Sequence, residues 1–279
     1  MNSSASLAIA ELREWIGRVD KAHDEITPRL VRELNATLDI HNEESTPLAI
    51  HWCLAPVAAP SSRVGRDGHP QRGGFLPPVA LPRRMWAGGQ LTFHDRLLPG
   101  DRVERKSKIA DVTMKEGRTG ALCFVAVDHE ISTPRGLAIT ERQDIVYRDL
   151  LAPAPGAKSL RPTELPKPTW QRSMRPDTIL LFRYSSLTFN GHRIHYDRDY
   201  AMNQEYYPGL VVHGPLQATL LIGFAEAILG RAPVQFSFRG VSPLFDFQSF
   251  TLGAVEQEGE LKLWIVNEDG VQTMDANAQ

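Results

Sequence analysis

Apolar residues recur first at helical and then at strand-like spacing along the first half of the chain. Residues 7–19 place their apolar side chains on one helical face, and residues 27–38 begin with Thr27 as N-cap and Pro28 in the first turn. Both segments predict helices. Turn residues separate three later strand-like runs, which predict an antiparallel meander: 102–117, 120–132 and 136–149.

The second half pairs a long apolar helix with another meander. Helical spacing over 215–229, with Pro215 at the start and Gly230 at the end, predicts a core helix. Four strand-like runs follow, at 233–242, 249–259, 260–270 and 271–276. The segments from Gln90 and Gln235 align without gaps at an offset of 145 residues. We therefore predict one sheet-around-helix unit made twice.

Two Pro-rich stretches interrupt these patterns. Residues 63–82 are rich in Gly, Pro and Arg, which marks a long ordered loop of a kind that is often functional. Residues 151–169 contain five prolines and suit a semi-rigid linker. We predict an N-terminal domain at 1–150, the linker at 151–169 and a C-terminal domain at 170–279, which agrees with a length of 279 residues.

Composition narrows the class of protein. A formal net charge of −2 argues against nucleic-acid binding through bulk positive charge, and no stretch approaches the ~18 apolar residues of a membrane span. Cys53 and Cys123 match no metal-ligand or redox spacing, which predicts buried, reduced side chains. The N-terminus lacks the basic and apolar regions of a signal peptide, so we expect a cytoplasmic protein.

The run LTFNGHRIHYDRDYA (187–201) concentrates polar side chains between two apolar segments. Asn190 and His195 could hold and deprotonate one water molecule, although a capped turn and a packed imidazole would explain the same residues. The pair His192 and His195 lacks further ligands at a recognisable spacing, so we expect no metal. Asp197 is expected to cap a helix.

A second candidate feature is His213-Gly214-Pro215 at the start of the long apolar helix. Free N–H groups at a helix N-terminus can stabilise a developing oxyanion, and a glycine allows close approach of a ligand. A glycine that only permits a tight turn before Pro215 is the structural alternative.

Several basic residues are candidates for binding an anion. Arg72, Arg83 and Arg84 flank the long loop, where their guanidinium groups could meet phosphates or a carboxylate, with Gly73 beside them. Arg193 lies inside the polar run and could serve the same purpose. Solvated loop arginines would look identical in the sequence.

The residues FNGHRIHYDRDYA, followed by YPGLVVHGPL, resemble the signature of MaoC-like hydratases and dehydratases. The RGGFLPPVALPRRMWAGG and GDRVERKSKIADVTMKEGRTG segments are similar to the two-domain branch, which contains hydroxyacyl-thioester dehydratase type 2 and the itaconyl-CoA and mesaconyl-C4-CoA hydratases. In the signature, Asn190 stands where many relatives carry aspartate, and His195 matches the histidine. The amide cannot accept a proton at neutral pH, which leaves proton transfer to His195.

The resemblance implies an α+β double hot-dog, in which two curved antiparallel sheets each surround a central helix and join into one. It also implies an acyl-CoA hydratase whose catalytic residues are Asn190, His195 and Gly214. The substrate or CoA would contact Arg72, Gly73, Arg83, Arg84, His192, Arg193 and His213.

We expect a short branched dicarboxylyl-CoA, such as itaconyl-CoA or mesaconyl-C4-CoA, to be hydrated to citramalyl-CoA, with no cofactor beyond the CoA thioester itself. One alternative is a (3R)-hydroxyacyl-thioester dehydratase or enoyl-CoA hydratase for linear chains. Another is a non-catalytic acyl-thioester-binding protein or a thioesterase. Two fused units are compatible with a monomeric pseudo-dimer or a homodimer.

Overall fold

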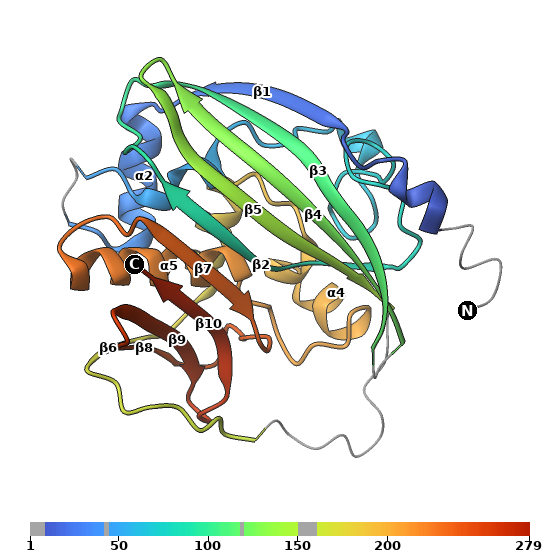
Figure 1. Cartoon of the computed structure of the whole chain (residues 1–279). Helices are drawn as coiled ribbons and strands as arrows, with labels where there is room; N and C mark the ends of the chain where they lie inside the picture. Colours follow the sequence, from blue (N-terminus) through green and yellow to red (C-terminus); the bar gives the residue numbers. More distant parts are fainter. Residues whose placement is uncertain (1–8, 42–44, 118–119, 150–160) are drawn as a thin grey trace.

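One curved antiparallel sheet extends through both halves of the molecule (Figure 1). The computed structural model describes residues 9–41, 45–117, 120–149 and 161–279. The first half contributes the strands β1 (Val19–Glu25), β2 (Arg83–Phe93), β3 (Arg102–Gly117), β4 (Gly120–Thr133) and β5 (Gly136–Arg148). The second half contributes β6 (Trp170–Met174), β7 (Gln235–Gly240), β8 (Phe250–Gln257), β9 (Glu260–Asn267) and β10 (Gln272–Ala278).

The strand order is symmetric about the centre of the sheet. It runs β1-β3-β4-β5-β2 and then β7-β10-β9-β8-β6, so each strand has a counterpart at the same distance from the centre. At the central pair, Gln90 lies opposite Ser237 and Thr92 opposite Gln235. The offset of 145 residues exchanges these two pairs, so the two half-sheets are related in the way that the predicted repeat requires.

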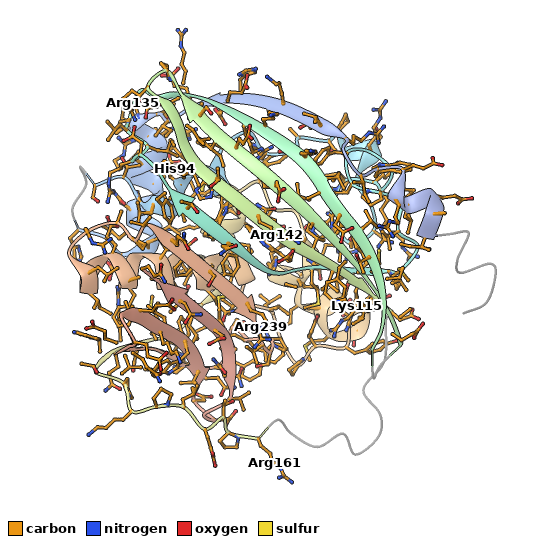
Figure 2. The ribbon with its side chains drawn as sticks, viewed as in Figure 1. His94, Lys115, Arg135, Arg142, Arg161 and Arg239 are labelled. Atoms are coloured by element: carbon orange, nitrogen blue, oxygen red, sulfur yellow. The ribbon has the colours of Figure 1, made fainter. Side chains whose placement is uncertain are left out.

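Alternation along the strands places polar residues outside and apolar residues inside the curve. On β3, Ile109 is buried whereas its neighbour Lys108 is exposed. Figure 2 labels Arg142 on β5 and Arg239 on β7, and both side chains are exposed. The interior is therefore on the side of the sheet that the helices cover.

The second half contains the long central helix that its sequence predicts. α5 (Gly214–Leu229) begins with Pro215 in its first turn and ends at Gly230, whose φ of 66° is readily adopted by glycine. It packs against strands β2, β7, β9 and β10. Three further α-helices are α2 (Pro28–Leu38), α3 (Thr178–Leu187) and α4 (Arg198–Asn203).

The first half differs from the expected central helix. Between α2 and β2, its described residues hold only two short 3₁₀ helices, η1 (Leu48–Cys53) and η2 (Ser61–Arg63). This segment contains many prolines, which cannot donate the hydrogen bonds of a long helix. The first half therefore presents a long loop where the second half has α5.

Of the two helices expected at the N-terminal end, the first needs correction. The helix expected over 7–19 covers only residues 9–13 of the described chain, because Gly17 adopts a φ of 86° and Val19 already starts β1. The second helix is confirmed: the Thr27 side chain accepts a hydrogen bond from the Leu30 N–H. Strands β1, β2 and β6 and helix α3 were not predicted, since their apolar patterns are short or irregular.

Other expectations concern the cysteines, the linker and the membrane. Cys53 and Cys123 are buried and free, as predicted. Residues 150–160 of the expected linker lie outside the described residues, and 161–169 form no helix or strand, so the domain limits stay a prediction. Within the described chain, none of the helices combines the length and apolar character needed to cross a bilayer.

Candidate active site

A cavity of about 770 Å³ lies between the two halves. It is lined by the loop between α3 and α4 (the catalytic loop, residues 188–197), by the start of α5 and by the long loop of the first half. Much of the wall is apolar and comes from the first half: Phe75, Leu76, Leu122, Phe124, Val127 and Ile145. An acyl chain could therefore extend along this wall, and polar side chains from both halves line the same cavity, among them His129 and Gln143 as well as Asn190 and His195.

Asn190 is held in a tight turn that follows α3. Phe189 adopts a φ of 51°, and the Asn190 N–H donates to the Ser185 carbonyl at 2.8 Å. The Asn190 Oδ1 accepts the His192 N–H at 3.0 Å, so the expected turn cap is present. Among the described residues no acceptor is found for its Nδ2, and Asn190 lines the cavity. The amide is thus both a cap and an available donor.

His195 has a fixed orientation. Its Nδ1 lies 2.7 Å from the Val211 carbonyl oxygen, which can only accept, so Nδ1 carries the proton. Burial lowers the pKa of His195 to about 4, and the Val211 bond opposes this shift. The imidazole is therefore neutral near pH 7. Its Nε2 carries a lone pair and can accept a proton in the cavity.

The start of α5 stands beside this imidazole. Gly214 lines the cavity, and as the first residue of the helix its N–H has no acceptor within the described chain. The His213 ring stacks on His195 at 3.6 Å between centroids, and its Nε2 bonds the Ser185 Oγ at 2.8 Å. His213 therefore supports the orientation of His195 from behind.

The predicted site residues separate into two groups. Six of them line the cavity, namely Arg72, Arg84, Asn190, His192, His195 and Gly214. The other four, Gly73, Arg83, Arg193 and His213, do not belong to its lining. The roles that the sequence analysis gives these ten residues remain predictions.

Most of the candidate arginines are held by the protein itself. Arg83 is buried and bonds Glu205 at 2.8 Å, which ties β2 to the segment after α4. Arg193 pairs with Asp197 at 2.7 Å, and Arg72 donates to carbonyls in the loop that follows it, including that of Leu81. Their guanidinium groups are largely occupied by these contacts.

Arg84 differs from these three. It is half-buried and lines the cavity, and no described carboxylate lies within the 4.0 Å of an ion pair with it. Burial is the main cause that lowers the pKa values of His69 and His192, and the charge of Arg84 lowers both further. Arg84 is therefore a cation close to the catalytic loop that could receive an anionic group of a ligand.

Sequence reasoning missed Asp67 and His69. They lie in the long loop of the first half, and His69 lines the cavity with its ring 4.2 Å from that of His192. One histidine in a Gly/Pro-rich loop gives little signal by itself. Only the length and composition of the loop pointed to a function.

Asp67, His69 and His192 bring ligand atoms within 4.8 Å of one another, which is close enough to surround a metal ion. Two observations disfavour this use. The Asp67 Oδ2 already bonds the His69 Nδ1 at 2.9 Å, and the positive charge of Arg84 acts on all three residues. The geometry fits a carboxylate–imidazole pair better than a cation site.

Comparison with known proteins agrees with this geometry. Residues 49–246 match the family model described as hydroxyacyl-thioester dehydratase type 2, which is more than half of the chain. The chain belongs to this family. Its members include the mitochondrial hydroxyacyl-thioester dehydratase type 2 of Schizosaccharomyces pombe, which is 28% identical over 244 residues, or 77% of this chain and 78% of that protein.

This chain is more similar to the mesaconyl-C(4)-CoA hydratase of Chloroflexus aurantiacus. It is 42% identical over 280 residues, which cover 98% of this chain and 99% of the relative. A solved MaoC-like dehydratase superposes with a TM-score of 0.71 at 14% identity, covering 94% of this chain and 97% of that one. A Mycobacterium tuberculosis protein described as a double hot-dog gives a TM-score of 0.56 at 12% identity, covering 94% and 95%. The MaoC-like two-domain family and the double hot-dog fold are thus confirmed.

Proposed function

We propose that this protein is a hydro-lyase that adds water to a short branched dicarboxylyl-CoA, mesaconyl-C4-CoA or itaconyl-CoA, to give citramalyl-CoA. The observation that carries the proposal is the pairing of His195, whose Nε2 is left as an acceptor, with the free Gly214 N–H at the start of α5. The 42% identity to a mesaconyl-C(4)-CoA hydratase over nearly the full chain supports the same reaction.

The chemistry follows from these groups. The Nε2 of His195 takes a proton from a water molecule that the Asn190 amide orients, and the water oxygen attacks the β-carbon. The electron pair moves to the thioester oxygen, where the Gly214 N–H stabilises the enolate. One such donor is typically worth on the order of 10²–10³ in rate. Acid–base chemistry of this kind needs no cofactor beyond the CoA thioester.

The position and charge of Arg84 support the proposal of a dicarboxylyl substrate. In mesaconyl-C4-CoA the free carboxylate is attached to the β-carbon, so it must lie beside the group that activates water. Arg84 acts on His69 and His192, and the His192 ring lies 5.5 Å from that of His195. A carboxylate placed between Arg84 and the histidines would complete an ion pair that the protein leaves open.

The alternative is a dehydratase or hydratase for linear (3R)-hydroxyacyl thioesters. The apolar wall formed by residues such as Phe124 and Ile145 would accommodate a longer chain, and the relative from Schizosaccharomyces pombe carries a dehydratase name. Substrate preference decides between the two.

The test compares mesaconyl-C4-CoA, itaconyl-CoA and crotonyl-CoA with purified full-length protein, following the enoyl-thioester absorbance. We expect the branched dicarboxylyl substrates to be hydrated best and the His195→Gln variant to be nearly inactive. Arg84→Gln should raise the KM for mesaconyl-C4-CoA at least about tenfold, because it removes a charge-assisted bond of about 1.5–3 kcal/mol. The KM for crotonyl-CoA, which has no free carboxylate, should stay unchanged. The charge-retaining Arg84→Lys variant is the matched control.

Each other outcome has a definite meaning. Best activity on crotonyl-CoA supports the alternative, and CoA release without hydration, detected with a thiol reagent, indicates a thioesterase. No change in any absorbance supports a binding role. A homodimer and a cytoplasmic location remain part of the proposal, and light scattering of the purified protein and cell fractionation test them.

A further inference from the structure

A loop of the first half places a second histidine at the catalytic end of the cavity. The Nδ1 of His69 donates to the Asp67 Oδ2 at 2.9 Å, and the Asp67 Oδ1 accepts the His69 backbone N–H at 3.1 Å. The Gly65 N–H donates to the His69 carbonyl at 2.7 Å, which closes the loop on itself. The ring is therefore held so that its other nitrogen, Nε2, is not used by Asp67.

This loop is docked directly onto the catalytic loop. The Arg193 N–H donates to the Asp67 carbonyl at 2.9 Å, and the Arg193 Nη1 donates to the Arg66 carbonyl at 3.1 Å. A Cβ added to Gly68 would lie 1.8 Å from the Gly191 carbonyl oxygen, so only glycine permits this approach. The position of His69 is thus fixed relative to Asn190 and His195.

The reaction proposed above requires two proton transfers, one from water and one to the α-carbon. Asn190 can perform neither, because its amide does not titrate. His213 does not belong to the cavity lining, and His192 has no carboxylate bonded to its ring within the described chain. His69 has such a carboxylate and lines the same part of the cavity.

We propose that His69, oriented by Asp67, is the second acid–base group of the site. This inference rests on the proposed hydratase function. In hydration, the water oxygen bonds to the β-carbon as its proton passes to His195 Nε2, and the alkene electron pair becomes an enolate. The enolate carbonyl re-forms as the α-carbon takes the proton from Nε2 of protonated His69. His195 then returns its proton to His69 through the His192 ring or a water molecule.

The charges that face His69 explain when it becomes protonated. Burial lowers its pKa, the bond to Asp67 raises it, and Arg84 and Arg72 lower it again, while His192 is kept neutral by its own burial. A substrate carboxylate paired with Arg84 would offset that positive charge and so favour the imidazolium. Substrate binding therefore favours protonation of His69, which then donates the proton to the α-carbon.

The decisive experiment measures hydration of mesaconyl-C4-CoA and exchange of the citramalyl-CoA α-protons in D₂O for the wild type and His69→Gln. We expect kcat to fall by roughly 10²–10⁴ with KM changed only slightly, and α-proton exchange to be lost. The hydration kcat of the wild type should fall at high pH as His69 loses its proton, and this limb should disappear in His69→Gln. His94→Gln, an exposed first-half histidine labelled in Figure 2, is the matched control.

Asp67→Asn provides a second variant that keeps the imidazole. Loss of the carboxylate lowers the pKa of His69, so the high-pH limb should move to lower pH. Retention of α-proton exchange and of the limb in His69→Gln would overturn the inference, as would dependence of the wild-type activity on added Zn²⁺. If the wild type hydrates none of the substrates, the proposed function itself fails, which is a separate result.

Discussion

The contact between Gly68 and Gly191 gives a sharp prediction about how the two halves cooperate. Replacing Gly68 by alanine places a Cβ 1.8 Å from the Gly191 carbonyl oxygen, whereas real Cβ contacts are essentially never shorter than 3.0 Å. The Gly68 backbone sets the position of the added Cβ and the other atom is a backbone oxygen, so no side-chain rotation relieves the clash. The first-half loop and the catalytic loop must move apart by more than 1 Å.

The size of the effect follows from this displacement. A misplacement of about 1 Å in a catalytic constellation can cost roughly 10² in rate. The same movement stretches the two hydrogen bonds that Arg193 makes with the loop, at about 0.5–1.5 kcal/mol each. The φ of 90° at Gly68 adds a backbone cost of about 1 kcal/mol for alanine. We expect kcat for Gly68→Ala to fall roughly 100-fold, together with a lower Tm.

Gly100 supplies the matched control because it has a φ of 87° and no heavy atom within 4 Å of an added Cβ. Gly100→Ala shares the backbone cost but not the clash, so its Tm should fall while its kcat stays near the wild-type value. Steady-state hydration kinetics and thermal unfolding of both variants make the comparison. A Gly68→Ala enzyme with kcat within twofold of the wild type would refute the dependence of catalysis on this docking.

Three further predictions concern charge. Asn190→Asp places a carboxylate near His195, which raises the His195 pKa above about 4, so the acid limb of kcat/KM should move to higher pH in a pH–rate profile. Arg83→Met leaves the buried Glu205 carboxylate unpaired and should cost about 3–5 kcal/mol in urea unfolding, with partial recovery in the double variant with Glu205→Gln. Bonds from His51 and other neighbours overcome burial and hold the pKa of Glu141 at about 2. Its stabilisation is present above the ordinary value of 4.5 and is lost as pH falls toward 2, so the Tm difference between wild type and Glu141→Gln should shrink over that range.

The sequence predicts the elements whose patterns are long and regular. Strands β3 to β5 and helix α5 fall within a few residues of their predicted limits, because alternation over more than ten residues or a helical stripe with Pro215 and Gly230 leaves little ambiguity. Strand β1 fails this test: only seven residues long, it follows a helical pattern and owes its conformation to pairing with β3. Tertiary contacts decide such short segments.

The same distinction applies to the site. Asn190, His195 and Gly214 are close in sequence to a recognisable pattern and prove to line one cavity. His69 lies more than 120 residues from His192, and only the docking of the loop brings their rings to 4.2 Å. Arg84 differs from the other candidate arginines because their guanidinium groups bond carboxylates or backbone carbonyls of the protein. The contact of His69 with His192 and the bonding partners of the arginines both depend on tertiary structure, so local sequence does not predict them.

The amide at position 190 and the docked first-half loop make sense together. A carboxylate at 190 would add a further titratable group to the loop that already holds His192 and His195, whereas the amide adds none. The long loop without a central helix allows Asp67 and His69 to reach the catalytic loop, and the glycines at 68 and 191 allow backbone contact. If His69 donates the second proton, the first-half loop and the amide at position 190 are two parts of one arrangement, in which each half supplies one acid–base group.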